Sequence, residues 1–307
     1  MRLPITLSAL LGWLLFFGQV SAAAPKPNVV TTTSMLADLV RNVGGDRVDV
    51  QSLMGPGVDP HLYKPTAADV ARLQRAKLVI YNGLMLEGQM GDLLARLAKA
   101  GRKVVAVGEA IPSDRLIKPD DGSNHPDPHI WGDAELWSLC ADRVAAALGD
   151  LDPAGAADYT ARAASHRAEL AKFHNWAKER AQLVPENRRI LITSHDAFNY
   201  FGRAYGFRVV GVQGISTVSE AGLADIVKIV DFIKEKGLKA VFVESSVPRA
   251  AIDRVSRDSG AKVGGELFSD ALGNPGKMHT VAGETYDEGT VIGMLKHNLN
   301  TVVEALK

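Results

Sequence analysis

Three histidines and one aspartate have the side chains and the placement of a transition-metal site. His61 and His129 each follow an Asp-Pro pair, and His195 and Asp270 each come shortly after a predicted strand. All four are expected in loops next to strand ends or helix starts, where α/β proteins bind their ligands. Three imidazoles and one carboxylate suit tetrahedral Zn²⁺, whereas Mn²⁺ prefers more oxygen ligands. The four residues are therefore candidate ligands of one divalent metal ion, and the alternative is an accidental pattern of solvated or capping loop residues.

Nearby carboxylates are candidates for orienting these imidazoles. Asp59, Asp127 or Asp196 could accept an N–H from a histidine ring, and the sequence does not decide between them. Glu244, at the end of a predicted strand, is a candidate for an additional oxygen donor to the metal. Because imidazoles bind metal only when neutral, we expect the affinity to fall below about pH 6.5, the ordinary pKa of histidine.

Composition excludes several other classes of protein. The 307 residues contain 35 Lys and Arg against 35 Asp and Glu, so the excess of positive charge typical of nucleic-acid binding or of a polybasic membrane-surface protein is missing. The single cysteine, Cys140, rules out an intramolecular disulfide and any metal site that needs several thiolates. The aromatic residues near the motifs, Trp131 and Trp137 among them, are expected to fill cores.

The first residues predict export. Met1-Arg2 precedes a largely apolar stretch, Leu3–Val20, and small residues follow at Ala22–Ala24. This order is typical of a cleaved signal peptide, here 1–24. The alternative, a membrane anchor, is disfavoured because the stretch is shorter than the roughly 20 residues of a membrane span. Since no cysteine follows it, the mature protein is predicted to be free in the periplasm and not a lipoprotein.

The remaining chain alternates short β-branched runs with helical segments, which predicts an α/β fold. We expect two Rossmann-like lobes of mostly parallel sheet, 25–151 and 186–307, each supplying two of the metal ligands. The segment 152–185 between them has good helix formers and an apolar face at alternating spacings of four and three. It predicts one long rigid helix joining the lobes, with two shorter helices and a kink as the alternative.

Six segments resemble the zinc/manganese family of metal-specific substrate-binding proteins of ABC importers. The similarity runs from about Asn28 to Val303, in family order, through GVDPHLYKPTAAD, DPHIW, TSHDAFNYFGRAYGF, VFVESSVPR, FSDALG and YDEGTVIGMLKHNLNTV. The resemblance implies two lobes joined by a long helix, with the metal bound in the cleft by His61, His129, His195 and Asp270. It further implies a monomeric periplasmic receptor, not an enzyme, that delivers the metal to its cognate ABC permease in the inner membrane.

Departures from the family pattern bear on which metal is bound. His195 occupies a position where many manganese-type members have Glu, and 111–128 contains one histidine, His125, in place of the long His-rich loop of many zinc-specific members. The nitrogen-rich ligand set favours zinc, with manganese next and iron a minor candidate. The competing function is an exported metal-dependent hydrolase, which would need an open metal position and a general base.

Overall fold

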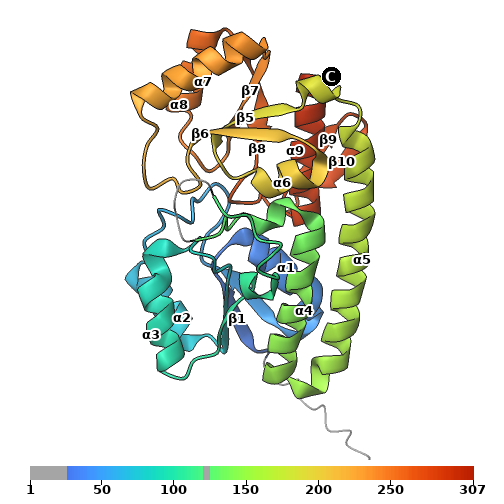
Figure 1. Cartoon of the computed structure of the whole chain (residues 1–307). Helices are drawn as coiled ribbons and strands as arrows, with labels where there is room; N and C mark the ends of the chain where they lie inside the picture. The colour runs from blue at the N-terminus through green and yellow to red at the C-terminus, as the bar shows by residue number, and fades with distance from the viewer. Residues whose placement is uncertain (1–25, 120–124) are drawn as a thin grey trace, which may run out of the picture.

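The computed structural model describes residues 26–119 and 125–307, and it consists of two α/β lobes beside one long helix, α5 (Figure 1). The predicted signal peptide, 1–24, lies outside the described residues. Within them, none of the helices combines the length and the apolar character needed to cross a membrane.

The first lobe is built on a parallel sheet of four strands in the order β2-β1-β3-β4. Apolar side chains cover both faces of this sheet: Val30 and Val79 contact α2 and α3 on one face, while Val29 and Leu78 belong to the cluster formed with α1 and α4 on the other. The elements are β1 (Asn28–Thr31), α1 (Ser34–Gly44), β2 (Asp49–Ser52), α2 (Ala67–Arg75), β3 (Leu78–Tyr81), α3 (Gly91–Lys99), β4 (Val104–Ala106) and α4 (Ala134–Leu151).

The second lobe contains two parallel strand pairs, β5-β6 and β7-β8, with β5 lying beside β7. Helices α7 and α8 cover one side of these strands, and α9 packs along β8 on the other. The elements are β5 (Ile190–His195), α6 (Asn199–Tyr205), β6 (Arg208–Gln213), α7 (Leu223–Lys236), β7 (Ala240–Glu244), α8 (Ala250–Ser259), β8 (Lys262–Leu267) and α9 (Val291–Leu306).

An antiparallel hairpin in the second lobe was not foreseen from the sequence. Its strands, β9 (Met278–Val281) and β10 (Glu284–Asp287), are joined by a two-residue turn at Ala282 and Gly283. Both turn residues have positive φ, 53° and 83°. That is the conformation of the type I′ turn that suits two-residue hairpins. Apart from the buried Tyr286, the strand residues are exposed or half-buried, and the two strands lack the apolar alternation that marks a half-buried strand in sequence.

Helix α5 (Ala156–Ala181) is continuous, so the long-helix prediction is confirmed and the kinked alternative is wrong. Its 26 residues span about 39 Å. It contacts α1 and α4 of the first lobe and α6 and α9 of the second, as Figure 1 shows. The predicted apolar face is the buried one, and it consists of Tyr159, Ala163, His166, Leu170, Phe173 and Ala177.

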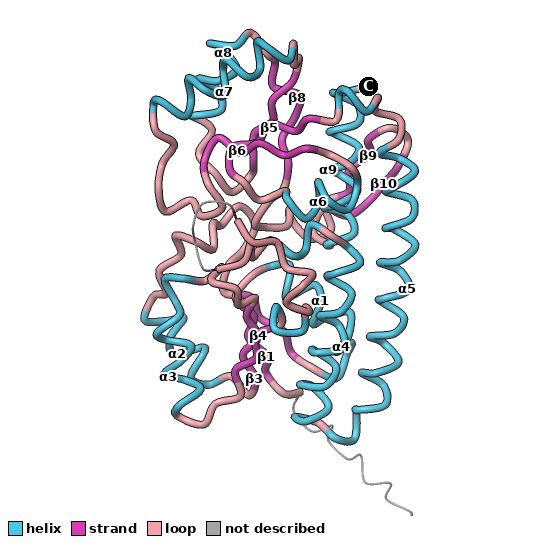
Figure 2. Tube along the Cα trace, in the orientation of Figure 1, coloured by secondary structure: helices cyan, strands magenta, loops and turns pink. Residues whose placement is uncertain are grey.

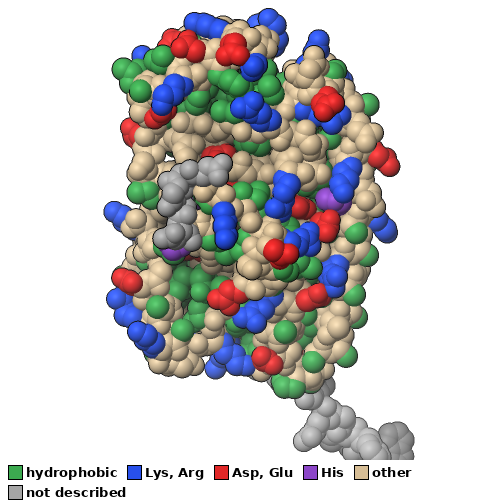
Figure 3. Space-filling model, in the orientation of Figure 1, with side chains coloured by type: hydrophobic (Ala, Val, Ile, Leu, Met, Phe, Trp, Pro, Cys, Tyr) green, Lys and Arg blue, Asp and Glu red, His purple; other side chains and the backbone are tan. Residues whose placement is uncertain are grey.

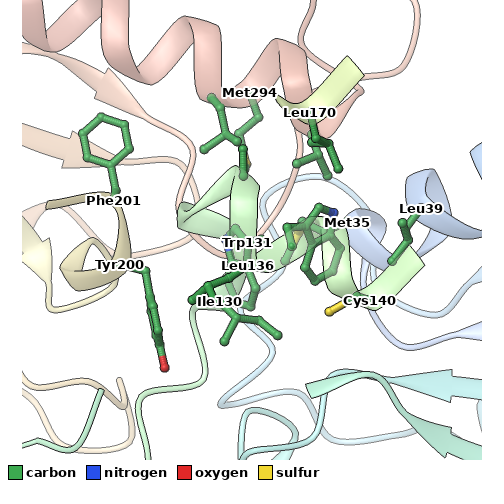
Figure 4. Close-up of a cluster of buried hydrophobic side chains, with 14 of the residues drawn as sticks. Met35, Leu39, Ile130, Trp131, Leu136, Cys140, Leu170, Tyr200, Phe201 and Met294 are labelled. Atoms are coloured by element: carbon green, nitrogen blue, oxygen red, sulfur yellow. The ribbon is translucent and has the colours of Figure 1, made fainter. Parts of the chain in front are cut away.

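One hydrophobic core runs through both lobes. A single cluster includes Leu36 and Trp137 from the first lobe, Leu170 from α5, and Phe242 and Leu299 from the second. Figure 4 shows part of this cluster. Between the lobes, the segments that leave the carboxyl ends of the strands form a layer of loops (Figure 2). The continuous core fixes the lobes on either side of that layer.

Leu170→Ala tests whether the helix and both lobes form one cooperative unit. Leu170 is fully buried, so the cavity left by alanine is expected to lower the free energy of unfolding by about 2–5 kcal/mol. Urea unfolding followed by circular dichroism should show one transition, shifted to lower urea. The control is Lys172→Ala, an exposed position on the same helix, which should change stability by less than about 0.5 kcal/mol. Two separate transitions in the wild-type protein would contradict a single core.

Candidate metal centre

The structure brings together the four residues predicted from the sequence. One ligand atom from each of His61, His129, His195 and Asp270 lies within 4.8 Å of the others. His61 follows β2, His129 precedes α4, His195 ends β5 and Asp270 follows β8, so two come from each lobe. Their exposed fractions are 4%, 0%, 0% and 1%. The cluster is therefore a closed site in the loop layer between the lobes.

The distances between donor atoms match those around a single small cation. The Nε2 atoms of His61 and His129 are 3.3 Å apart. The carboxylate of Asp270 places Oδ1 3.3 Å from the Nε2 of His129 and Oδ2 3.2 Å from the Nε2 of His195. Metal–ligand bonds of about 2.0–2.1 Å in a tetrahedron put neighbouring donors about 3.3 Å apart. The Nε2 of His195 and both oxygens of Asp270 are buried and have no hydrogen-bond partner among the described residues, as expected for atoms that bind a metal.

The two Asp-Pro-His segments fold in the same way. In each, the aspartate accepts a hydrogen bond from the backbone N–H of the histidine two residues later, at 2.8 Å for Asp59 and His61 and at 2.9 Å for Asp127 and His129. Asp127 also lies 2.7 Å from the Nδ1 of His129, which leaves Nε2 facing the cluster. The sequence offered Asp59, Asp127 and Asp196 as carboxylates that could orient a histidine ring. Of these, Asp127 orients the ring of His129.

Side chains of the second lobe bind both of these aspartates. The hydroxyl of Thr217 donates to Asp59 at 2.6 Å. The amide of Asn199 donates to Asp127 at 3.1 Å. Each metal-facing histidine of the first lobe is therefore held by a carboxylate that the second lobe contacts.

Glu244 orients His195, a role that the sequence analysis did not assign to it. Its carboxylate accepts the backbone N–H of His195 at 2.8 Å and lies 2.5 Å from the ring Nδ1. The side chain therefore binds the ring nitrogen that faces away from the cluster. The only signal in the sequence was its position at the end of β7, next to β5.

Carboxylates outside and inside the cluster set the proton affinities of the rings. Burial opposes protonation of His129, but Asp127 and Asp270 outweigh it and raise the pKa to about 9. Burial likewise opposes protonation of His195, yet Glu244 and Asp270 raise its pKa well above the usual value. Burial lowers the pKa of His61 to about 3 despite Asp270. The common pKa of about 6.5 expected from the sequence is therefore raised for His129 and His195 and lowered for His61.

The pKa of Asp270 shifts in the direction opposite to the effect of burial. Burial alone would raise it, but His195 and His129 hold it well below its usual range. The carboxylate is consequently ionised and ready to bind a cation.

His61 marks the side of the cluster that faces solvent. It lines a 290 Å³ hollow together with apolar side chains from both lobes, among them Leu84, Met85, Ile215 and Val218. His125, the single histidine of the 111–128 segment, lines the same hollow. His129, His195 and Asp270 do not line it. A metal ion passing through this hollow would meet His61 first.

The other histidines and the cysteine lie away from the cluster. His166 and His174 are buried on α5, and His297, on α9, bonds the backbone carbonyl of Glu266. His279 pairs with Glu288 at 2.7 Å. Cys140 is buried in α4 with its thiol toward the carbonyl of Val107. Of the described residues, only the four ligand candidates form a group of at least three potential metal donors.

Comparisons with known proteins identify the family to which the chain belongs. Residues 29–305 match the family described as "Zinc-uptake complex component A periplasmic". The chain is 42% identical over 308 residues to the zinc-binding protein TroA of Treponema pallidum, covering 98% of this chain and 96% of TroA. It is also 42% identical to the manganese-binding lipoprotein MntA of Bacillus subtilis, covering 91% of this chain and 89% of MntA.

The solved structure of the periplasmic zinc-binding protein TroA from Treponema pallidum has the same fold. It superposes with a TM-score of 0.86 at 42% identity, covering 92% of this chain and 99% of TroA. This chain therefore belongs to the family of the periplasmic zinc-uptake component A.

Proposed function

We propose that this protein is a periplasmic receptor that binds one divalent transition metal through His61, His129, His195 and Asp270 and delivers it to an ABC permease. The observation that carries the proposal is the balance of buried charge. Asp127, Glu244 and Asp270 are 0%, 3% and 1% exposed, and no lysine or arginine pairs with them in the described part of the chain. Buried carboxylates need compensating positive charge, which a divalent cation at this point supplies.

Zinc is the favoured metal and manganese the next. Three imidazole nitrogens and one carboxylate oxygen make the tetrahedral set that Zn²⁺ prefers, and such a set binds Zn²⁺ more tightly than Mn²⁺. Both oxygens of Asp270 face the histidines, however. A carboxylate that binds through both oxygens gives a fifth donor, which suits Mn²⁺ or Fe²⁺. Both TroA, named for zinc, and MntA, named for manganese, are relatives.

The geometry supports a receptor over the alternative, an exported hydrolase. A catalytic metal keeps one position open for water or substrate and has a free carboxylate as general base. Here four protein groups enclose the metal position, and the neighbouring carboxylates already accept other hydrogen bonds: Asp59 from Thr217, Asp127 from Asn199 and Glu244 from His195. A closed set of four donors suits binding and transport.

Release is proposed to depend on the loops. We assign 25–151 and 186–307 to the two lobes and 152–185 to the segment joining them, and a continuous helix and core along both resist a wide hinge opening. The bound metal would leave toward the hollow beside His61 once a ligand-bearing loop moves. The receptor is proposed to act as a monomer, free in the periplasm after signal-peptide cleavage.

Replacing a ligand tests the site. His61→Ala and His195→Ala are each expected to weaken zinc binding by more than about a hundredfold, a greater loss than the typical effect of removing an outer-shell partner. The control is His166→Ala, which removes a buried histidine that lies outside the cluster. Zinc affinity is measured by competition with a chelator on the mature protein. If both ligand variants retain tight stoichiometric binding, the assignment is wrong.

Competition between metals tests the order of preference. With zinc and manganese at equal concentration, elemental analysis of the purified protein is expected to find zinc bound at one ion per chain. Predominant manganese under these conditions would contradict the preference for zinc without contradicting the site itself.

Metal binding is expected to release protons. Because the pKa of His129 is about 9 and that of His195 is raised, both rings carry protons at neutral pH before metal binds. The apparent affinity should therefore fall as pH decreases from about 9, by about tenfold per unit for each proton displaced. Titration calorimetry in buffers of different ionisation enthalpy counts these protons. Glu244→Gln should reduce the number of protons released, since His195 loses a charged partner. A zinc affinity that does not change between about pH 7 and 8.5 would refute the assignment of protons to His129 and His195.

A further inference from the structure

The residue before Asp270 accepts a hydrogen bond from the other lobe. The indole N–H of Trp131 donates to the carbonyl oxygen of Ser269 over 2.8 Å, between positions 138 apart in the sequence. Both side chains are 2% exposed. The carbonyl of Ser269 belongs to the planar peptide that also contains the Cα of Asp270. A bond that fixes this oxygen therefore restricts the position of the Asp270 Cα, from which the side chain extends.

Trp131 is also tied to His129. It lies two residues later, in a 3₁₀ turn at Ile130–Gly132, and the two rings meet edge to face with centroids 5.3 Å apart. Figure 4 shows Trp131 within the core, next to Ile130 and Leu136. One rigid side chain thus contacts the His129 ring and bonds to the peptide leading into Asp270.

Ser269 has a second link, to the segment that orients His195. Its hydroxyl lies 2.8 Å from the hydroxyl of Ser246. Ser246 comes two residues after Glu244, whose carboxylate binds His195. Ser269 therefore joins the segments that carry or orient three of the four ligand candidates.

We propose that Trp131 is a positioning residue that holds Asp270 in register with His129 and so slows the escape of the bound metal. The proposal rests on the function proposed above. Movement of the loop that carries Asp270 away from the histidines breaks the bond from Trp131 and leaves a buried carbonyl unpaired. Without the indole N–H, Asp270 swings away at lower cost, and we expect the metal to dissociate about tenfold faster.

The test removes the N–H and keeps the shape of the ring. Trp131→3-benzothienylalanine replaces the indole N–H by sulfur, and Trp131→Phe is the simpler variant. The matched control is Trp137→3-benzothienylalanine, because Trp137 is fully buried in the same cluster while its indole nitrogen has no hydrogen-bond partner in the described part of the chain. Zinc dissociation is measured by stopped-flow capture with a chelator. Co²⁺-loaded protein reports the coordination geometry through its visible absorption.

The expected result is faster zinc release and an altered Co²⁺ spectrum for the Trp131 variants, with neither change in the Trp137 control. Equal dissociation rates and spectra at both positions would overturn the proposal, since a packing role alone does not depend on the N–H. If a Trp131 variant does not fold, Ser246→Ala removes the other link to Ser269 and should speed release in the same direction; an unchanged rate would count against the proposal. Wild-type protein that binds no zinc would instead refute the proposed function.

Discussion

The arrangement of this molecule depends on burying negative charge between two lobes. Asp127, Glu244 and Asp270 are almost fully excluded from solvent, and their only ion-pair partners among the described residues are histidine rings. Such charge is costly to bury unless a positive charge accompanies it. Either protons on the histidine rings or a divalent cation supplies this positive charge. The structure thus makes metal and protons compete for the same site, and this competition links affinity to pH.

Asp59, Asp127 and Glu244, the carboxylates outside the cluster, bind the histidines in two different ways. Asp127 and Glu244 each bind both the backbone N–H and the Nδ1 of a histidine, which directs Nε2 to the metal position. Asp59 binds only the backbone of His61 and is in turn bound by Thr217. His61 is also the ligand that borders the hollow. Among the described residues, the ligand candidate with the lowest pKa, whose ring no carboxylate binds at Nδ1, is therefore the one that borders the hollow.

Much of this could be predicted from the sequence, and the remainder depended on contacts between distant residues. The strand and helix alternation predicted both lobes, and the uninterrupted apolar face from Tyr159 to Ala177 predicted α5. The four ligand candidates were identified by residue type, loop position and family resemblance, and the structure places their donor atoms together. The role of Glu244 in orienting His195 could not be assigned because it arises from the packing of β7 beside β5, which brings together residues 49 positions apart. Trp131 was expected to fill the core, which it does; its bond to Ser269 depends on how the lobes meet.

The β9–β10 hairpin lacks an apolar pattern and relies on the turn conformation of Ala282 and Gly283. The charges on the visible face are mixed in sign (Figure 3), consistent with the balanced composition.

The same features that hold the metal also limit how it can leave. Helix α5 and one hydrophobic cluster extend along both lobes, so separating the lobes would expose core side chains such as Trp137 and Leu170. Exposure of large apolar side chains costs several kcal/mol, more than the loss of a few hydrogen bonds at the surface of the core. Individual hydrogen bonds, such as those from Thr217 and Asn199, also hold the segments between the lobes, and each can break without separating the core. Movement of these loops is therefore the less costly change. Local movement of the loops, with the lobes held in place by the helix and the core, is therefore the way in which we propose that the site opens.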